Sequence, residues 1–227
     1  MNYRQGLFAL LSFFFTMTLA QAAAFSNKEA TAGLKEALVR GAEHAVTTLG
    51  TQDGFLGNGK VRISLPESLQ PIETLGRTLG LGKQMDELVT TMNRAAESAV
   101  TEAKPLLVQS VKNMSVKDAY DILSGPQDAA TQYFRKTTSV QLTEKIRPLV
   151  HKATARLKLS EKYDKLAGKA AKLNLIDANE ANLDTYVTQK TLDGLFLMIA
   201  EQEQQIRANP IETGSKLLQK VFGSLGR

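Results

Sequence analysis

The chain has 227 residues, of which 43% are hydrophobic, 22% are charged and 6% are aromatic, and it contains no cysteine and no tryptophan. These proportions are typical of a globular protein and exclude a disordered chain, a collagen-like chain and a disulfide scaffold. The 28 basic and 23 acidic residues give a net charge of +5, with both signs mixed along the chain. A chain of this length favours a single domain.

The first 24 residues have the pattern of a secretory signal peptide. Arg4 supplies a positive charge, an apolar run extends from Leu7 to Leu19, and a series of small residues follows. A charged start, a short apolar run and a small-residue site are the features that signal peptidase recognises. The run is shorter than the roughly 20 apolar residues that span a bilayer. We therefore expect cleavage after Ala22 or Ala24 and a soluble, periplasmic protein whose residues 25–227 form one domain.

Helical periodicity begins directly after this segment. A capping-box spacing at Ser26 and Glu29 precedes apolar residues at three- and four-residue steps, which predicts a helix that ends at Gly50. Residues 51–60 contain three glycines and no periodicity, so they predict a flexible loop. Residues 61–65 alternate between apolar and polar side chains, which predicts a short extended segment, and no second strand is evident to pair with it.

The middle of the chain continues the helical pattern. Residues 67–79 predict a helix that glycines end. The longest apolar stripe runs over 85–114 and predicts one helix with a kink at Pro105, because proline lacks the N–H that the preceding turn needs. Ser115 and Asp118 have the spacing of a cap and open a short helix.

The last third is predicted to be helical as well. Residues 128–157 predict two helices that meet near 137–139, with a proline bending the second, and 161–173 predict another helix. The strongest pattern, 192–206, ends before a proline, and a basic helix follows at 211–222. The fold class is therefore all-α, with about eight or nine helices in one domain.

One stretch matches the spacing of a phosphate-binding loop. Gly54, Gly59 and Lys60 fit the pattern G-x-x-x-x-G-K, but Val61 occupies the position where a serine or threonine hydroxyl would bind Mg²⁺. The stretch also follows a predicted helix, whereas the phosphate-binding loop follows a buried strand and opens a helix. The pattern therefore indicates a glycine-rich loop and not a nucleotide site.

Other chemistries are poorly supplied. His44 and His151 stand singly, so they form no zinc pair. Asp177, Asn179 and Asn182 resemble a calcium loop, but the required glycine is missing. Thr188 also stands where a bidentate glutamate is needed. We interpret these polar residues as caps of the following helix. Nucleophile motifs and cysteine are absent. We expect no metal and no cofactor, and the sequence disfavours an enzyme.

Basic residues do not indicate nucleic-acid binding. Lys165, Lys169 and Lys172 share a helix face, but acidic neighbours interrupt it, and no nucleic-acid-binding module is recognisable. The basic, apolar segment from Ile211 to Arg227 has two interpretations. It either packs on the core of its own domain or makes a peripheral contact with an anionic membrane surface.

Several stretches spread over the chain form a recognisable set. They are Ile63-Ser64-Leu65-Pro66, Asn93-Arg94-Ala95-Ala96-Glu97, Ala129-Ala130-Thr131-Gln132-Tyr133-Phe134, Asp184-Thr185-Tyr186-Val187-Thr188, Leu192-Asp193-Gly194-Leu195-Phe196, Ile206-Arg207-Ala208-Asn209-Pro210 and Leu217-Leu218-Gln219-Lys220-Val221-Phe222-Gly223. On these residues the chain resembles the bacterial domain-of-unknown-function family 4197 over essentially its whole mature length. The resemblance implies an exported, mostly helical domain, and it carries over no catalytic residue.

These observations favour a non-enzymatic, exported binding or interaction protein. The catalytic motifs are absent while apolar helices are abundant, so we expect a groove between helices that holds a hydrophobic ligand, a peptide or a partner protein. Two alternatives remain open. One is an enzyme of an unfamiliar type, and the other is a structural envelope-associated protein that docks through its basic C-terminal helix.

Four side chains are the candidate binding residues. Tyr133, Arg135, Tyr186 and Asp193 lie within or beside the recognisable stretches and can all take part in hydrogen bonds. Gly194 follows the last of them and would let another backbone or a ligand approach closely. We expect the four to converge on one cavity if they bind a ligand. The alternative is a structural network that joins two helices.

Overall fold

The computed structural model describes residues 27–155 and 177–209, and between these ranges it describes residues 161, 163–164, 167–168 and 171–172. The described residues are predominantly helical and contain no β-strand, which confirms the all-α class. Within them, no helix is both long and apolar enough to cross a membrane. The predicted signal peptide (1–24), Ser26 of the first capping box and the predicted basic helix (211–222) lie outside the described residues.

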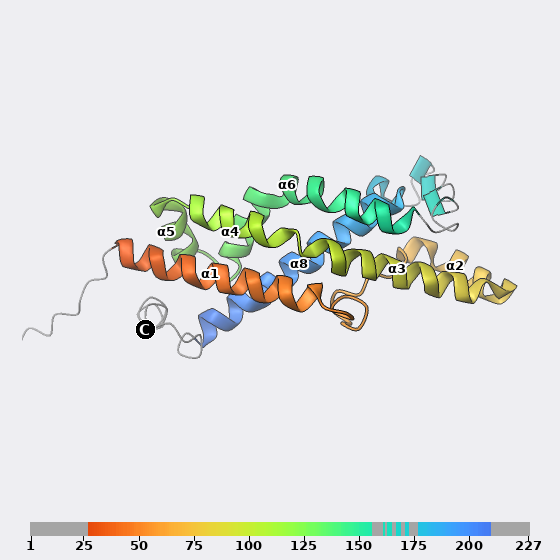
Figure 1. Ribbon diagram of the computed structural model, residues 1–227, viewed down its shortest axis with the longest axis horizontal. Coiled ribbons are helices and arrows are strands. Elements are labelled where there is room, and N and C mark those ends of the chain that lie inside the picture. The colour runs from red at the N-terminus through yellow and green to blue at the C-terminus, as the bar shows by residue number, and fades with distance from the viewer. Residues whose placement is uncertain are drawn as a thin grey trace, which may run out of the picture.

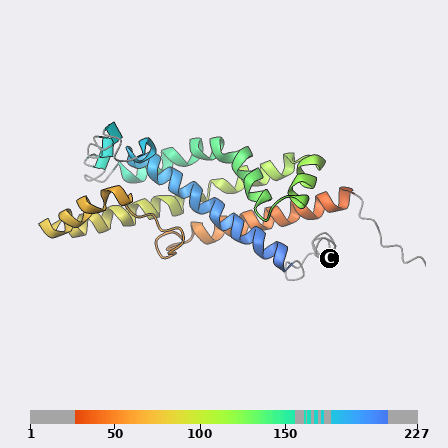
Figure 2. The same ribbon diagram turned by 180° about the vertical axis from the view of Figure 1, so that it is seen from behind.

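The helices form an elongated bundle, which Figures 1 and 2 show from opposite sides. They are α1 (Asn27–Gly50), α2 (Gln70–Gly76), α3 (Gly82–Val100), α4 (Ala103–Asn113), α5 (Val116–Ser124), α6 (Ala129–Thr154) and α8 (Leu183–Ala208), with the short elements η1 (Glu67–Leu69), η2 (Arg77–Leu81) and η3 (Ala178–Glu180). Helix α8 runs diagonally through the bundle and packs on α6, α1 and α3. Helices α4 and α5 pack against α1 at one end, and α2 lies beside α3 at the other.

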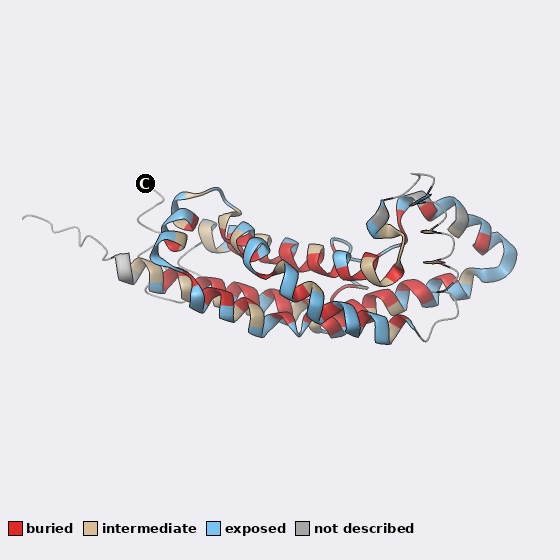
Figure 3. Cartoon of the chain, turned by 90° about the horizontal axis from the view of Figure 1, so that it is seen from above, coloured by how far each residue is buried: buried red, intermediate tan, exposed pale blue. Residues whose placement is uncertain are grey.

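The core lies where these helices face one another. Each long helix buries apolar side chains at three- and four-residue steps, as the sequence predicts. Figure 3 shows the buried positions on the inward faces. The largest fully buried side chains come from α1, α3, α4, α6, α8 and the segment between α1 and α2: Leu34, Leu49, Phe55, Ile63, Leu88, Met92, Leu107, Phe134, Leu142, Ile146, Leu183 and Phe196.

Two predicted helix boundaries are wrong. The predicted helix over 85–114 is interrupted, since α3 ends at Val100 and α4 begins at Ala103. Pro105 does not kink a continuous helix, because it is the third residue of α4. In the first turn of a helix the N–H has no partner within the helix, so proline is tolerated there.

The boundary expected near 137–139 does not exist, because α6 is continuous from Ala129 to Thr154 and passes through Pro148. The hydroxyl groups of Thr137, Thr138 and Ser139 donate to the carbonyl oxygens four residues earlier, at 2.8, 2.6 and 2.5 Å. Hydroxyls bonded in this way stay compatible with the helix. The described residues form fewer helices than the eight or nine expected, and the predicted helices at 161–173 and 211–222 lie partly and wholly outside the described residues.

Candidate functional site

The glycine-rich loop at 51–60 is bound to α3 by a buried glutamate. The Glu97 carboxylate accepts hydrogen bonds from the backbone N–H groups of Phe55 and Leu56, both at 3.1 Å, and from the guanidinium of Arg94 at 2.6 Å. Arg94 also bonds to Asp53 at 2.8 Å. The bonds to Glu97 and Asp53 raise the pKa of Arg94. Glu97 is therefore a structural group that fixes the loop.

The segment that follows the loop forms hydrogen bonds to an asparagine side chain. In a β-sheet, the same backbone groups would bond to a neighbouring strand. The side-chain oxygen of Asn93 accepts from the N–H of Ile63 at 2.8 Å, and its amide donates to the carbonyl of Ile63 at 2.8 Å and to that of Val89 at 2.7 Å. Asn93 is fully buried. A buried amide with these partners satisfies the backbone of a single extended residue.

The loop also sends an aromatic anchor into the core. Phe55 is fully buried, and its ring lies against Gly194 of α8. A Cβ atom at position 194 would lie 2.7 Å from the Phe55 ring and 3.2 Å from Val61 Cβ. The expected close approach to Gly194 is therefore present, and the approaching group is a side chain of the same chain. This anchor and the bonds to Glu97 attach the glycine-rich loop to α8 and α3.

A second buried glutamate joins α8 to α6. The Glu203 carboxylate accepts from the backbone N–H groups of Ala130 and Thr131 at 3.0 and 2.9 Å, at the start of α6. The first N–H groups of a helix have no partner within the helix, so this carboxylate caps α6 from a neighbouring helix. Arg207 bonds to the same carboxylate at 2.8 Å and to the Ile122 carbonyl at 2.9 Å.

The four candidate binding residues do not meet in one cavity. The Tyr133 hydroxyl donates to the Ser110 carbonyl of α4 at 3.0 Å, whereas the Tyr186 hydroxyl donates to the Ser64 carbonyl at 2.7 Å. Burial raises the pKa of Tyr133 and raises that of Tyr186 to about 12. Both tyrosines thus join elements of the fold.

Arg135 and Asp193 do come together, on the surface between α6 and α8. The guanidinium of Arg135 stacks over the Phe196 ring, with its carbon 4.5 Å from the ring centre. Its nearest nitrogen lies 3.6 Å from the Asp193 carboxylate, which is beyond hydrogen-bonding distance. Asp193 instead accepts from the Gln189 amide at 3.0 Å. The ring therefore orients the guanidinium, and the carboxylate attracts it without using its N–H donors.

Arg135 lines an open groove of about 310 Å³ between α6 and α8. The other lining residues combine hydroxyl, amide and apolar side chains: Ser139, Val140, Thr143, Gln189, Leu192 and Phe196. Val140 stands at this surface with 73% of its area exposed. The groove offers a fixed cation beside apolar contacts, which suits a group with a carboxylate and an apolar neighbour. We call this hollow the α6–α8 groove.

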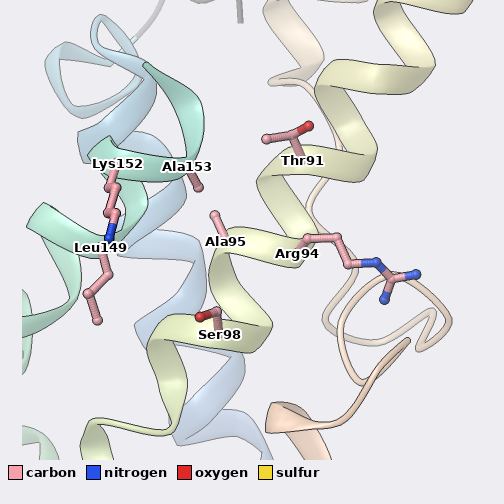
Figure 4. A pocket seen from close by; sticks show the side chains of 7 residues that line it. All are labelled: Thr91, Arg94, Ala95, Ser98, Leu149, Lys152 and Ala153. Atoms are coloured by element: carbon pink, nitrogen blue, oxygen red, sulfur yellow. The ribbon is translucent and has the colours of Figure 1, made fainter. Parts of the chain in front are cut away.

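A second open hollow, of about 380 Å³, lies between α3 and α6 (Figure 4). Ala95 and Ala153 point toward each other across it, while the Arg94 side chain points away. Arg94 is already bonded to Glu97 and Asp53. Lys152 is the second cationic residue of this lining. Small side chains form much of this hollow, and its lining contains four polar side chains, as many as the lining of the α6–α8 groove.

His151, which stands singly in the sequence, has a carboxylate beside it in the structure. Its Nδ1 lies 2.6 Å from Asp184, which also accepts from the Thr154 hydroxyl at 2.6 Å. Asn182 accepts from the Thr185 N–H at 3.1 Å, which confirms it as the cap of α8. In the described part of the chain, no group of three or more His, Cys, Asp or Glu side chains could hold a metal ion.

The local sequence patterns do not predict the roles of Asn93 and Glu97. Both occupy the apolar face of α3, one residue after the buried Met92 and Ala96. Polar residues four apart on a buried face are a usable signal, because they need partners inside the protein. These patterns also do not predict that Arg135 stacks on the Phe196 ring, because the two residues lie on different helices.

Comparison with known proteins identifies a family. The model of the family "Protein of unknown function (DUF4197)" matches residues 24–223. No significant match was found among curated proteins or among solved structures. The matched range contains every structural feature described above, including the bonds of Glu97 to the glycine-rich loop and the α6–α8 groove. The chain belongs to the DUF4197 family.

Proposed function

We propose that the protein is a non-enzymatic interaction protein that binds a segment of a partner protein in the α6–α8 groove. The partner places a carboxylate on Arg135 and an apolar side chain beside Val140 and Leu192. The observation that carries this proposal is the position of Arg135, stacked over Phe196 at 4.5 Å at the wall of the groove.

The chemistry of Arg135 supports a carboxylate as its ligand. A guanidinium has five N–H donors and binds carboxylates through two parallel hydrogen bonds along one edge. Stacking on Phe196 restricts the plane of the group, so less conformational freedom is lost on binding. Asp193, at 3.6 Å, balances the charge in the free protein and leaves an edge for the partner.

The shape of the groove supports a polypeptide segment more than a small hydrophobic ligand. Sites for small molecules bury most of the ligand surface in a cleft. The α6–α8 groove is open, and its exposed Val140 would remain in contact with water beside a small molecule. A helix or an extended segment can cover such a groove along its length, with a few anchors in contact.

A non-enzymatic role is supported by the use of the buried acidic groups. Glu97 and Glu203 are the buried carboxylates of the described residues, and each bonds to two backbone N–H groups and to an arginine. Both are therefore engaged in holding the fold. Neither lies in the lining of the α6–α8 groove.

We also propose that the protein acts in the periplasm after removal of residues 1–24. The support comes from the sequence, in the charged start, the apolar run and the small residues before Ala24. Amino-terminal sequencing of the protein from the periplasmic fraction should find a start near residue 23 or 25. An intact Met1 on that protein would contradict this proposal.

Site-specific crosslinking tests the groove. A photo-reactive amino acid at Val140 should crosslink to a partner protein in cells, and the same group at Tyr120, equally exposed on α5, should not give that product. Arg135→Gln should abolish the product and weaken binding of the identified segment by about tenfold or more, since a charge-assisted pair is lost. Arg147→Gln, an exposed arginine on the same helix, is the matched control and should retain both.

Two outcomes would contradict the proposal. One is a crosslink from Val140 that Arg135→Gln leaves unchanged. The other is a small apolar molecule that copurifies with the protein and is lost when Leu192 is changed to serine, with no protein crosslinked at Val140.

A further inference from the structure

Three of the exposed large apolar side chains of the described residues lie together at one end of the bundle. Helices α2 and α3 form a hairpin that extends to the end of the molecule (Figure 1), where Figure 3 shows a run of exposed positions. Leu75, Leu79 and Leu81 are exposed by 58%, 70% and 37%. We call these three leucines, together with Arg77 and Lys83, the hairpin tip. The α6–α8 groove shares no residue with the hairpin tip.

The hairpin has a defined geometry that holds the leucines outward. The chain reverses at Gly80, whose φ of 82° is readily available only to glycine. Behind the turn, Gly76 allows close packing, because a Cβ there would lie 2.7 Å from the end of the Met85 side chain. Arg77 bonds to Glu73 and to Asp86, both at 2.8 Å, and so links the two arms.

The charges around the tip suit a phospholipid surface. Arg77 and Lys83 are the charged residues between Leu75 and Gln84, and both are cations. The nearest acidic residues along the chain, Glu73 and Asp86, are both bonded to Arg77. With Lys83, the two cations and the two carboxylates sum to zero. The turn over residues 78–84 therefore presents leucines and, as its charged residue, the exposed Lys83. Leucines that enter the acyl boundary beside cations at the headgroup level are typical of interfacial membrane contacts.

The size and shape of the tip argue against a protein as its occupant. A stable protein interface buries about 800 Å² on each partner and needs a complementary surface. The tip is a narrow projection with three partly exposed leucines, and η2 contains no buried residue. A bilayer can accept a small convex apolar tip, because lipids rearrange around it. We propose that the hairpin tip inserts into the surface of a phospholipid bilayer.

Tryptophan fluorescence can test this directly, because the chain contains no tryptophan. Leu79→Trp places a single indole at the tip, and Val140→Trp places one at an equally exposed position on the body. With vesicles of phosphatidylglycerol and phosphatidylethanolamine, Leu79→Trp should shift to shorter wavelength and be quenched by brominated lipid. Val140→Trp should do neither. A response of both variants, or of neither, would overturn the proposal.

A second variant separates the tip from other membrane contacts. In the full chain, replacement of all three leucines by serine should lower the partition coefficient onto the same vesicles by at least about tenfold, because most of the inserting apolar surface is removed. The matched control replaces Val116, Tyr120 and Val140, which are also exposed, and should bind like the unaltered protein. Full binding by the leucine variant would overturn the proposal. An indole shift of Leu79→Trp that depends on protein concentration, and not on lipid, would assign the tip to a second copy of the chain.

Discussion

The chain has two glycine-rich segments, at 54–59 and at 76–82, and the structure uses them in opposite ways. The first is fixed to the body, with Phe55 buried in the core and its N–H bonded to Glu97 at 3.1 Å. The second is a turn at the end of a projecting hairpin, with Leu79 exposed. Glycine content is alike in the two segments, so it does not decide whether a segment is part of the scaffold. An apolar anchor and a buried polar partner decide it.

The largest expected effect concerns the two apolar side chains that distinguish the segments. Phe55→Ala should lower the free energy of unfolding by about 3–5 kcal/mol, because it removes a fully buried aromatic ring. Leu79→Ala should change it by less than about 0.5 kcal/mol, because that side chain contacts mainly solvent. Urea unfolding of both variants measures the difference. Equal effects would erase the distinction between the segments.

Loss of the carboxylate clamp should be nearly as severe. Glu97→Ala removes the acceptor of the Phe55 and Leu56 N–H groups, and buried N–H groups without a partner are costly. The expected loss is about 2–4 kcal/mol in the free energy of unfolding. Glu87→Ala, at an exposed position of the same helix, serves as the control and should cost less than about 0.5 kcal/mol. A Glu97→Ala variant as stable as the control would show that the loop does not depend on the clamp.

The contact of the loop with α8 gives a smaller, steric prediction. Gly194→Ala should lower the free energy of unfolding by about 1–3 kcal/mol, because the new Cβ would meet the Phe55 ring at 2.7 Å. Gly59→Ala is the matched change within the loop, where a Cβ would have no neighbour within 4 Å. It should be neutral or slightly stabilising. Thermal unfolding of the two variants distinguishes them, and the reverse order of stability would be inconsistent with the packing described.

The smallest effect is a dependence on alkaline pH. Burial raises the pKa of Tyr186 to about 12, above the value of about 10 in an unfolded chain. The unfolded state therefore loses this proton first, and the stabilising contribution is complete below pH 10 and lost as the pH rises toward 12. Tyr186→Phe should cost about 0.5–1.5 kcal/mol at neutral pH, through loss of the bond to Ser64, and should flatten the alkaline decline. An equally steep decline in the variant would assign the alkaline transition to other groups.

Much of the fold follows from local patterns in the sequence. The three- and four-residue steps of apolar side chains predict the buried faces of α1, α3, α6 and α8. The cap at Ser115 and Asp118 is also formed, since each residue accepts a hydrogen bond from the backbone N–H of the other. The hydroxyl of Ser115 also donates to the Asp118 carboxylate, and this bond, together with the bond from the Ser115 N–H, lowers the pKa of Asp118. Such features depend on neighbours within one turn of helix, so the sequence contains all the information they need.

The site depends on contacts between distant residues, which local patterns do not contain. Asn93 bonds to a residue 30 positions away, and Glu97 to residues 41 and 42 positions away. The pairing of Arg135 with Asp193 and Phe196 requires the register of α6 on α8. The sequence therefore predicts Arg135 of the groove and its neighbour Asp193 as candidates, but it cannot predict that Tyr133 and Tyr186 face other elements.

Hydrogen exchange of the backbone amides, with and without phospholipid vesicles, tests the contrast between the two glycine-rich segments most directly. The amides of Phe55, Leu56 and Ile63 bond to buried side chains, so they should be strongly protected in both samples. The amides of 76–82 should exchange rapidly in solution and become protected when vesicles are added. Exchange of the first segment as fast as the second in solution, or no effect of vesicles on the second, would contradict this account.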